Sequence, residues 1–449
     1  MTDLNNARVL IAGTHSGCGK TTVTVAIIAA LRARGVAVSA FKCGPDYIDP
    51  MFHRRALGVA AHNLDPFFST HEQLAAAVAS QGAGSLAVIE GVMGYYDGVG
   101  TTTRASTYEV AQATKTPVVL VIDASGMAAS VGAVLGGFTD FREPSAIAGV
   151  IFAQVPASMS GFYAAAIRDT GLVPLGCLPH RDSLALPSRH LGLVAADEIG
   201  ALDAIIAELG RLAEDSLDLD GLTALARRAT PLPAAPPGAP EQPARVRLAV
   251  ARDEAFCFTY AETLEQWQHQ GCELVFFSPL SDTRLPDGTA ALYLPGGYPE
   301  NHLEALSANS ALRHQLANAI EGGLPTIAEC GGFMYLHRDI DGLPMVGVFN
   351  ASAHTTNRLQ RFGYTTLTAA HDNLLCHAGG SLPAHEFHYA DSTDPGDGFT
   401  GRKASAANTY QVGHASMTMY AGFPHLYLAA APHASQRFVD QARQFGAAR

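Results

Sequence analysis

The fold of the first half of the chain is decided by the stretch ARVLIAGTHSGCGKTTVTVAIIAALRARG, residues 7–35. Its first part, 7–13, is continuously apolar, as is typical of a buried parallel strand. A Gly-rich turn follows and opens into a helical pattern. Backbone N–H groups at such a turn, together with the helix N-terminus, form a cradle for phosphate. The stretch therefore predicts a P-loop.

Side chains in this turn have the types that nucleotide binding needs. Lys20 supplies positive charge to the β- and γ-phosphates, and Thr21 supplies a hydroxyl for Mg²⁺. The spacing departs from the strict pattern, because Thr14 stands at the first glycine position and Gly13 lies one residue further out. A Gly-rich turn without a ligand is the alternative, which the strand, glycines, Lys20 and Thr21 in register disfavour. The predicted ATP-binding residues are Thr14, Ser16, Gly17, Gly19, Lys20, Thr21 and Thr22.

Working outward, further apolar runs at 85–91, 116–123 and 145–155 alternate with helical patterns. This alternation predicts an α/β fold in which a doubly wound parallel sheet carries helices on both faces. Glu90 ends one of these runs, where a carboxylate is costly unless it has a partner or a ligand such as a metal ion. Asp46, Asp49 and Asp97 lie in predicted loops and, taken singly, are more typical of turn residues.

A Pro-rich segment, 230–245, divides the chain and holds six prolines. Repeated proline disfavours helix, so this segment predicts an extended linker between domains at 1–229 and 246–449. Strand and helix patterns restart after it, with strand candidates VRLAVAR, CELVFFSPL, ALYLPGG and PTIAEC. From about 345 the sequence holds more Thr, Gly and Tyr, which predicts a partly antiparallel region.

Composition narrows the classes of protein. The 449 residues are 48% hydrophobic and 16% charged, which argues against disorder and coiled coils. A net charge of -12 without a basic cluster argues against nucleic-acid or anionic-membrane partners. Neither a signal peptide nor a run of about 18 apolar residues is apparent. The seven cysteines include no CxxC pair, so we expect a reduced, cytoplasmic protein.

A second candidate site centres on Cys330 in LPTIAECGGFMYL, 324–336. A cysteine at a sharp strand-to-helix turn is held exposed, and the helix N-terminus is expected to lower its pKa. A lone cysteine is more often a small buried apolar residue, but the Gly-Gly loop in LYLPGGYPE, 292–300, can add an oxyanion donor. His425 is one candidate base, with His385 and His388 as competitors. The HEFH spacing does not match a zinc protease site.

Seven motifs in order are similar to those of the cobyrinic acid and hydrogenobyrinic acid a,c-diamide synthase family. They are GTHSGCGKTT, FKCGPDYIDP, IEGVMGYYDG, LPSRHLGLV, LPGGYPE, AECGGFMYL and HEFHY. The resemblance implies a P-loop domain like dethiobiotin synthetase, followed by a class I glutamine amidotransferase-like domain. It implies ATP-dependent, glutamine-hydrolysing amidation of the a and c carboxylates of the corrinoid through an acyl phosphate, with Mg²⁺.

The resemblance also implies roles for residues. The metal partners are Thr21, Asp46 and Glu90, and the residues near the corrinoid are Tyr47, Asp97, Ser188, Arg189 and His190. The glutaminase residues are the nucleophile Cys330, its base His425, and the oxyanion donors Gly297 and Gly331. Ordinary class I glutaminases carry Glu two residues after the catalytic His, but here that residue is Tyr427. The group that orients His425 is left open.

Other readings stay open at this point. Sirohydrochlorin a,c-diamide synthase and cobyric acid synthase share both domains, although FKCGPDYIDP and LPSRHLGL favour the diamide enzyme. A P-loop regulatory ATPase with a non-catalytic glutaminase-like domain is an alternative of a different class. The expected partners are a corrinoid and glutamine, with no nucleic acid and no membrane. The metal content of the corrinoid, the order of amidation, the ammonia route and a homodimer are left open.

Overall fold

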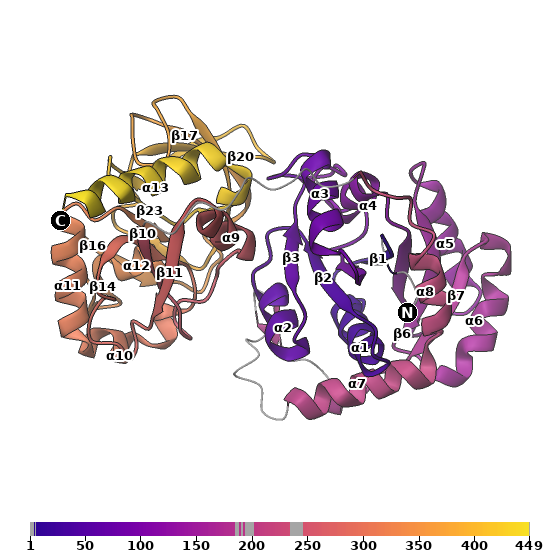
Figure 1. The fold of residues 1–449 in the computed structure, drawn as a ribbon. Helices are drawn as coiled ribbons and strands as arrows, with labels where there is room; N and C mark the ends of the chain where they lie inside the picture. The colour runs from indigo at the N-terminus through magenta and orange to yellow at the C-terminus, as the bar shows by residue number, and fades with distance from the viewer. Residues whose placement is uncertain are drawn as a thin grey trace. The chain divides into compact units, whose positions relative to one another are not determined.

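The computed structural model describes residues 4, 6–184, 188–189, 192–193, 202–233 and 246–448. The chain folds as two compact units, Met1–Gly238 and Ala239–Arg449 (Figure 1). Most of the Pro-rich segment lies outside the described residues. The division into 1–229, a linker at 230–245 and 246–449 therefore stays a prediction.

Seven of the described strands of the first unit form one sheet in which every adjacent pair is parallel. Its central strands are buried along their whole length, which explains their continuously apolar sequences. In spatial order the strands are β3 (Ala61–Leu64), β2 (Val38–Cys43), β4 (Leu86–Glu90), β1 (Arg8–Gly13), β5 (Val118–Asp123), β6 (Ile147–Ala153) and β7 (Val173–Leu178).

Helices cover both faces of this sheet. On one face Leu10 of β1 shares a buried cluster with residues of α3, α4, α5 and α6. On the other face α1 packs on α7, where a Cβ at Gly210 would lie 3.1 Å from the Cβ of Ala29. The predicted doubly wound fold is confirmed. The helices are α1 (Lys20–Ala33), α2 (Ile48–Leu57), α3 (His71–Gln81), α4 (Thr107–Thr114), α5 (Ser130–Asp140), α6 (Ser160–Ala166), α7 (Leu202–Ser216) and α8 (Leu219–Ala226).

The second unit contains a mainly parallel sheet whose described strands include all four strand candidates of the sequence. Its only antiparallel pair among the described strands is β22 with β23. In spatial order the strands are β11 (Cys272–Phe277), β10 (Val246–Ala251), β12 (Thr289–Leu294), β13 (Thr326–Glu329), β23 (Met419–Gly422) and β22 (His414–Ala415). The helices are α9 (Ala261–His269), α10 (Leu303–Ala308), α11 (Ser310–Glu321), α12 (Gly331–Tyr335) and α13 (Pro432–Ala447).

The last third of the chain adds two smaller sheets. The larger one is antiparallel throughout its described pairs, which confirms the predicted antiparallel region. Its strands in spatial order are β21 (Thr409–Val412), β20 (Phe399–Lys403), β17 (Arg361–Ala369), β18 (Ser381–His388) and β24 (His425–Leu426). The smaller one holds β15 (Leu343–Pro344), β14 (His337–Ile340), β16 (Phe349–Thr355) and β19 (Ala390–Ser392). Across the described parts of both units, no helix has the length and apolar character needed to cross a bilayer.

Candidate functional sites

The turn between β1 and α1 has the backbone geometry of an anion cradle. Gly17 and Gly19 adopt φ values of 83° and 96°, a left-handed conformation that favours glycine. No hydrogen bond among the described residues uses an N–H group of residues 16–21 as its donor. Unpaired N–H groups at a helix N-terminus bind anions, because the helix dipole adds positive potential there. The turn is therefore suited to hold phosphate.

Lys20 and Gly13 fit each other closely. A Cβ at Gly13 would lie 2.7 Å from the Lys20 side chain and 2.5 Å from Cys18 Sγ, so this position needs glycine. This close approach explains why the glycine stands one residue before the strict motif position. The Lys20 Nζ donates to the carbonyl of His15 at 3.1 Å, across the turn. Burial lowers the pKa of Lys20.

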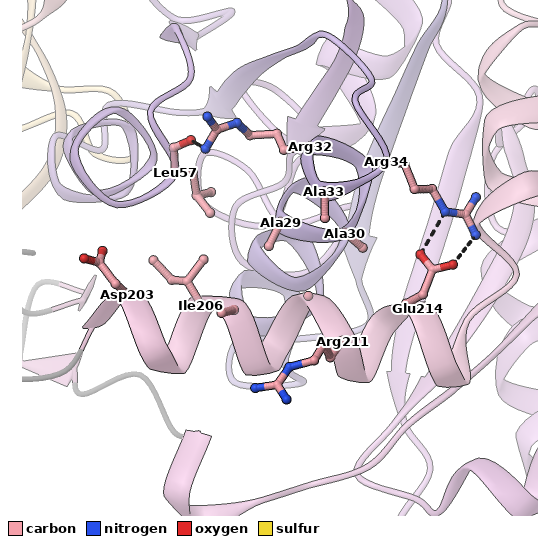
Figure 2. Close-up of a pocket in the computed structure, with 12 residues that line it drawn as sticks. Ala29, Ala30, Arg32, Ala33, Arg34, Leu57, Asp203, Ile206, Arg211 and Glu214 are labelled. Atoms are coloured by element: carbon pink, nitrogen blue, oxygen red, sulfur yellow. Dashed lines mark hydrogen bonds and ion pairs between the residues drawn. The ribbon is translucent and has the colours of Figure 1, made fainter.

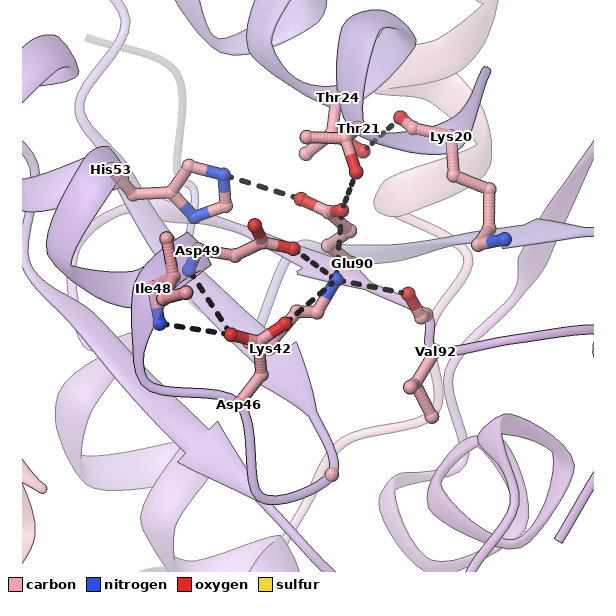
Figure 3. Close-up of polar contacts among 12 residues, drawn as sticks. Lys20, Thr21, Thr24, Lys42, Asp46, Ile48, Asp49, His53, Glu90 and Val92 are labelled. Carbon is pink, nitrogen blue, oxygen red and sulfur yellow. Dashed lines mark hydrogen bonds and ion pairs between the residues drawn. The ribbon is translucent and has the colours of Figure 1, made fainter. Parts of the chain in front are cut away.

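Three carboxylates and one lysine form a buried ion cluster beside the P-loop (Figure 3). The Lys42 Nζ lies 2.5 Å from Asp49 Oδ2, 2.9 Å from Glu90 Oε1 and 4.0 Å from Asp46 Oδ2. Thr21 of the P-loop donates its hydroxyl to Glu90 Oε1 at 2.6 Å. The cluster is thus joined directly to the turn that is suited to phosphate. Of the predicted metal partners, Thr21, Asp46 and Glu90 come together here.

The charges of the ion cluster depend on one another. Burial favours the neutral form of Glu90, but Lys42 and the nearby His53 outweigh this effect and hold the pKa of the carboxyl well below its usual range. Burial likewise favours neutral Lys42, yet Asp49 and Glu90 raise its pKa well above normal. Burial and Asp49 together raise the pKa of Asp46 to about 7. Asp46 is therefore the carboxyl of the cluster that titrates near neutral pH.

The oxygen donors of this cluster fit Mg²⁺ held together with nucleotide phosphate. Mg²⁺ prefers oxygen ligands and usually takes one or two carboxylates in addition to phosphate and water. Thr21 and Glu90 present such oxygens next to the P-loop. Within the described residues no three His, Cys, Asp or Glu side chains are arranged as a complete metal site. Where Mg²⁺ binds together with nucleotide, phosphate oxygens and water would supply further ligands.

The residues predicted near the corrinoid have different surroundings. Tyr47 is buried beside Asp46 at the start of α2. Asp97 is exposed, and its Oδ2 accepts a hydrogen bond from Gly94 N at 2.9 Å in a loop that lies against the P-loop. Ser188 and Arg189 form β8, which pairs with β9 (Gly192–Leu193), whereas His190 lies outside the described residues.

The sequence did not point to Lys42, a member of the ion cluster, or to its neighbour His53. Lys42 lies on a strand whose polar residues hid it from the search for apolar runs. His53 is fully buried on α2, and its Nε2 lies 3.2 Å from Glu90 Oε2. Asp49 was noted as a loop carboxylate but not as a site residue. The spacing of Asp49 and His53, four residues apart on one helix, is a signal that could have found them.

In the second unit, Cys330 occupies a strained turn between β13 and α12. Its φ of 47° and ψ of -104° are unusual for a residue with a side chain. Strain of this kind persists only where the surroundings enforce it, and it is frequent at catalytic sites. The backbone N–H of Cys330 donates to Gly422 O at 2.8 Å, which fixes the turn to the end of β23. This arrangement matches the predicted nucleophile position.

The two predicted oxyanion donors lie side by side near this turn. A Cβ at Gly331 would lie 3.1 Å from the backbone nitrogen of Gly297 and 2.8 Å from Pro299 Cδ. In the described parts of the chain, neither the N–H of Gly297 nor that of Gly331 donates to a backbone carbonyl. Two neighbouring N–H groups without such acceptors can stabilise a negatively charged oxygen.

His425 is a candidate base that lies beside this turn. A Cβ at Gly296 would lie 3.3 Å from His425 Nε2 and 3.4 Å from Cys330 Cβ, so these two side chains flank the same glycine. His388 instead stacks on Phe423 with ring centroids 4.1 Å apart, and its Nδ1 donates to Ala390 O at 2.7 Å. The geometry therefore favours His425 over His388.

The expected low pKa of Cys330 is not found. Burial raises the pKa of the thiol, and the nearby carboxyl of Glu300 acts in the same direction. A hydrogen bond from the N–H of Gly331 opposes this shift but is weaker. Helix α12 spans only Gly331–Tyr335, so its dipole is small. A thiolate at Cys330 would therefore need a neighbouring base to accept its proton.

A surface pocket of the first unit lies apart from these residues (Figure 2). Its lining comes from α1, α7 and Leu57, and an ion pair between Arg34 Nε and Glu214 Oε2 at 2.8 Å closes one end. None of the predicted site residues lines it.

Fold and site geometry define a two-part protein, a P-loop nucleotide-binding unit followed by a class I glutamine amidotransferase-like unit. Residues 9–194 match the family of CobQ/CobB/MinD/ParA nucleotide binding domains, and residues 247–431 match the CobB/CobQ-like glutamine amidotransferase domain. Hydrogenobyrinate a,c-diamide synthase of Thermobifida fusca is 40% identical over 96% of each chain. Cobyrinate a,c-diamide synthase of Caldanaerobacter subterraneus is 37% identical over 97% of this chain and 98% of the relative. The chain belongs to the cobyrinate and hydrogenobyrinate a,c-diamide synthase family.

Proposed function

We propose that this protein uses ATP and glutamine to amidate the a and c side-chain carboxylates of cobyrinic or hydrogenobyrinic acid. The observation that carries the proposal is the hydrogen bond, 2.6 Å long, between the P-loop hydroxyl of Thr21 and the buried Glu90. In the same chain, Cys330 and His425 flank one glycine, Gly296. Relatives named for this reaction match nearly the whole length of the chain. A regulatory ATPase with a non-catalytic second domain has no need for Cys330 and His425 at such a turn.

In the proposed first half-reaction, the substrate carboxylate attacks the γ-phosphorus of ATP and gives an acyl phosphate and ADP. A carboxylate is a poor electrophile, and phosphorylation turns its oxygen into a leaving group. The N–H groups of 16–21 and Lys20 hold the phosphates, and Thr21 and Glu90 are the ligands we assign to Mg²⁺. When bound, the ion neutralises phosphate charge. Asp46 is the third residue that we assign to the ion, and we assign Tyr47 and Asp97 to contacts with the corrinoid.

In the proposed second half-reaction, Cys330 attacks the side-chain amide of glutamine and releases ammonia. His425 takes the thiol proton, and the N–H groups of Gly297 and Gly331 stabilise the oxyanion. Water then hydrolyses the γ-glutamyl thioester to glutamate. Ammonia attacks the acyl phosphate carbon, phosphate leaves, and the amide forms.

The test is an assay of the full chain with Mg²⁺, ATP and glutamine on both corrinoids. We expect each amidation to consume one ATP and one glutamine, so that conversion of the acid into its diamide consumes two of each. Mass spectrometry resolves the acid, the monoamide and the diamide. Incubation with carboxyl-¹⁸O-labelled substrate should move one ¹⁸O into phosphate. Amidation of neither corrinoid, with amidation of sirohydrochlorin or of a diamide substrate instead, would replace this proposal by one of the related enzymes.

A further inference from the structure

Glu329, the residue before the nucleophile, has contacts that a structural carboxylate does not need. It ends β13, is 1% exposed, and accepts hydrogen bonds from Tyr293 OH at 2.9 Å and from Leu426 N at 3.0 Å. Its Oε2 also lies 3.7 Å from His425 Nδ1. A buried carboxylate is costly, and it is retained when its charge has a partner.

Glu329, His425 and Cys330 lie in one neighbourhood. The Nδ1 of the His425 imidazole faces Glu329, and its Cε1 and Nε2 lie beside Gly296, which the Cys330 side chain also flanks. A carboxylate on one ring nitrogen fixes the tautomer that leaves the other nitrogen free to accept a proton, and it stabilises the resulting imidazolium. Burial raises the pKa of the Cys330 thiol, so its proton is harder to remove. A carboxylate beside His425 Nδ1 makes that imidazole a stronger base.

We propose that Glu329 is the positioning residue for His425 and takes the place of the Glu that ordinary class I glutaminases carry two residues after the His. That place holds Tyr427 here. The inference rests on the proposed glutaminase activity. The proton moves from Cys330 Sγ to His425 Nε2 and then to the departing ammonia, and Glu329 takes no proton in this transfer.

Other groups near His425 do not take this role. His385 lies opposite His425 in the β18–β24 pair, and burial and the charge of His425 lower its pKa to about 3, so it stays neutral. Glu386, the next residue on β18, accepts from Tyr410 OH and lies 3.9 Å from His388 Nε2. Glu329 Oε2, by comparison, lies 3.7 Å from His425 Nδ1.

The test compares Glu329→Gln with wild type in glutamine hydrolysis across pH, using the full chain. Glutamine keeps the shape and an oxygen for Leu426 N but removes the charge. We expect kcat to fall at least about tenfold with KM little changed, since wrong-tautomer variants of catalytic triads lose up to about 10⁴. In the plot of kcat/KM against pH, the acidic limb, where activity falls as the pH drops, should move to lower pH. Amidation driven by ammonium salt should be unaffected.

Two further variants keep the result decisive. Tyr293→Phe removes a donor from Glu329 Oε2 and leaves the charge, so the acidic limb should move to higher pH. Glu386→Gln removes a buried carboxylate that is bonded to Tyr410 OH and lies 3.9 Å from His388 Nε2, so any shift it causes in the acidic limb should be smaller than that of Glu329→Gln. If neither Glu329→Gln nor Tyr293→Phe shifts the acidic limb of kcat/KM, Glu329 only holds Leu426 in place and the inference is wrong. Glutamine hydrolysis that persists in Cys330→Ala would instead overturn the proposed function.

Discussion

Among single residues, Lys20 is the one whose removal separates the two half-reactions. Its ammonium lies in the P-loop turn, where it is aimed at phosphate rather than at glutamine. We expect Lys20→Ala to lose amidation by about 10² to 10³, the usual effect of removing one preorganised charge contact. Glutamine hydrolysis should persist at a measurable rate, because Cys330 lies in the other unit. Unchanged amide formation would contradict the P-loop assignment.

Asp46 gives the first unit a pH-dependent stability. Its pKa is raised to about 7 by burial and Asp49, whereas an unfolded aspartate has a pKa of about 3.9. A carboxyl with a raised folded pKa contributes stability that is complete below about pH 4 and is lost as the pH rises through about 7. Asp46→Asn keeps an oxygen that accepts from Ile48 N, and the variant does not lose stability through ionisation of this side chain as the pH rises.

The measurement is the urea midpoint of Asp46→Asn minus that of wild type, in Mg²⁺-free buffer between about pH 4 and 8. We expect the difference to grow with pH and to level off above about pH 7. A difference that is flat across this range would mean that Asp46 is not perturbed by its surroundings.

Candidate residues could be singled out in the sequence where a side chain stands in a recognisable backbone motif. Lys20, Thr21 and Cys330 all stand at strand-to-helix turns, whose glycines mark them in the sequence. Lys42 and His53 have no such marker, because they reach the site only through the packing of β2 and α2 beside β4. The role of Glu329 likewise depends on β24 returning beside β13, a contact between residues about a hundred positions apart.

At the scale of elements, two helical glycines that look alike in the sequence should respond oppositely to alanine. Gly137 of α5 is exposed, and a Cβ there would meet nothing within 4 Å. Gly137→Ala should therefore raise the free energy of unfolding by about 0.4 to 1 kcal/mol, because alanine restricts the unfolded chain. Gly210→Ala should bring no such gain, since its Cβ would press on the backbone of Ala29 and Ala30.

Thermal melting of both variants checks this expectation. A difference of 1 kcal/mol corresponds to a shift of about 2 to 4 °C in the Tm of a unit of this size. Equal stabilisation by both substitutions would show that α1 and α7 move apart enough to accommodate the added methyl group.

Strand prediction failed at β2 and β3 for a physical reason. Buried polar residues, Lys42 on β2 and His62 and Asn63 on β3, interrupt the apolar runs that identified β1, β4, β5 and β6. Such residues are tolerated in a buried strand only because each has polar partners, as Asn63 does in the carbonyls of Gly44 and Asp46. These two strands form the edge of the sheet that carries the ion cluster, and β7 at the opposite edge was likewise not identified from the sequence.

For the whole molecule, the sequence predicted two α/β parts because each restarts the alternation of strand and helix after the Pro-rich segment. The order of the strands was not predictable in the same way. In the first unit β1 lies between β4 and β5, so the P-loop and Glu90 meet at neighbouring strand ends. That adjacency is a property of the topology, and it turns two separate motifs into one site.

The division of labour between the two units makes the sharpest prediction. Cys330 is needed to release ammonia from glutamine, but no step on the acyl phosphate requires a thiol. Cys330→Ala should lose glutamine-dependent amidation and keep ATP-dependent amidation when ammonium salt is supplied. Free NH₃ is the nucleophile, so the rescued rate should rise with pH as more ammonium is deprotonated. The measurement is diamide formation with either nitrogen source.

His425→Ala should behave like Cys330→Ala, because the buried thiol has a raised pKa and depends on that base to form the thiolate. His388→Ala is the matched control, since its ring stacks on Phe423 and donates to Ala390 O away from Cys330. It should keep glutamine-dependent activity, apart from any loss of folded protein. Full glutamine-dependent activity in Cys330→Ala would mean that ammonia is released elsewhere, and loss of ammonium-driven amidation in the same variant would mean that the two half-reactions are not separable.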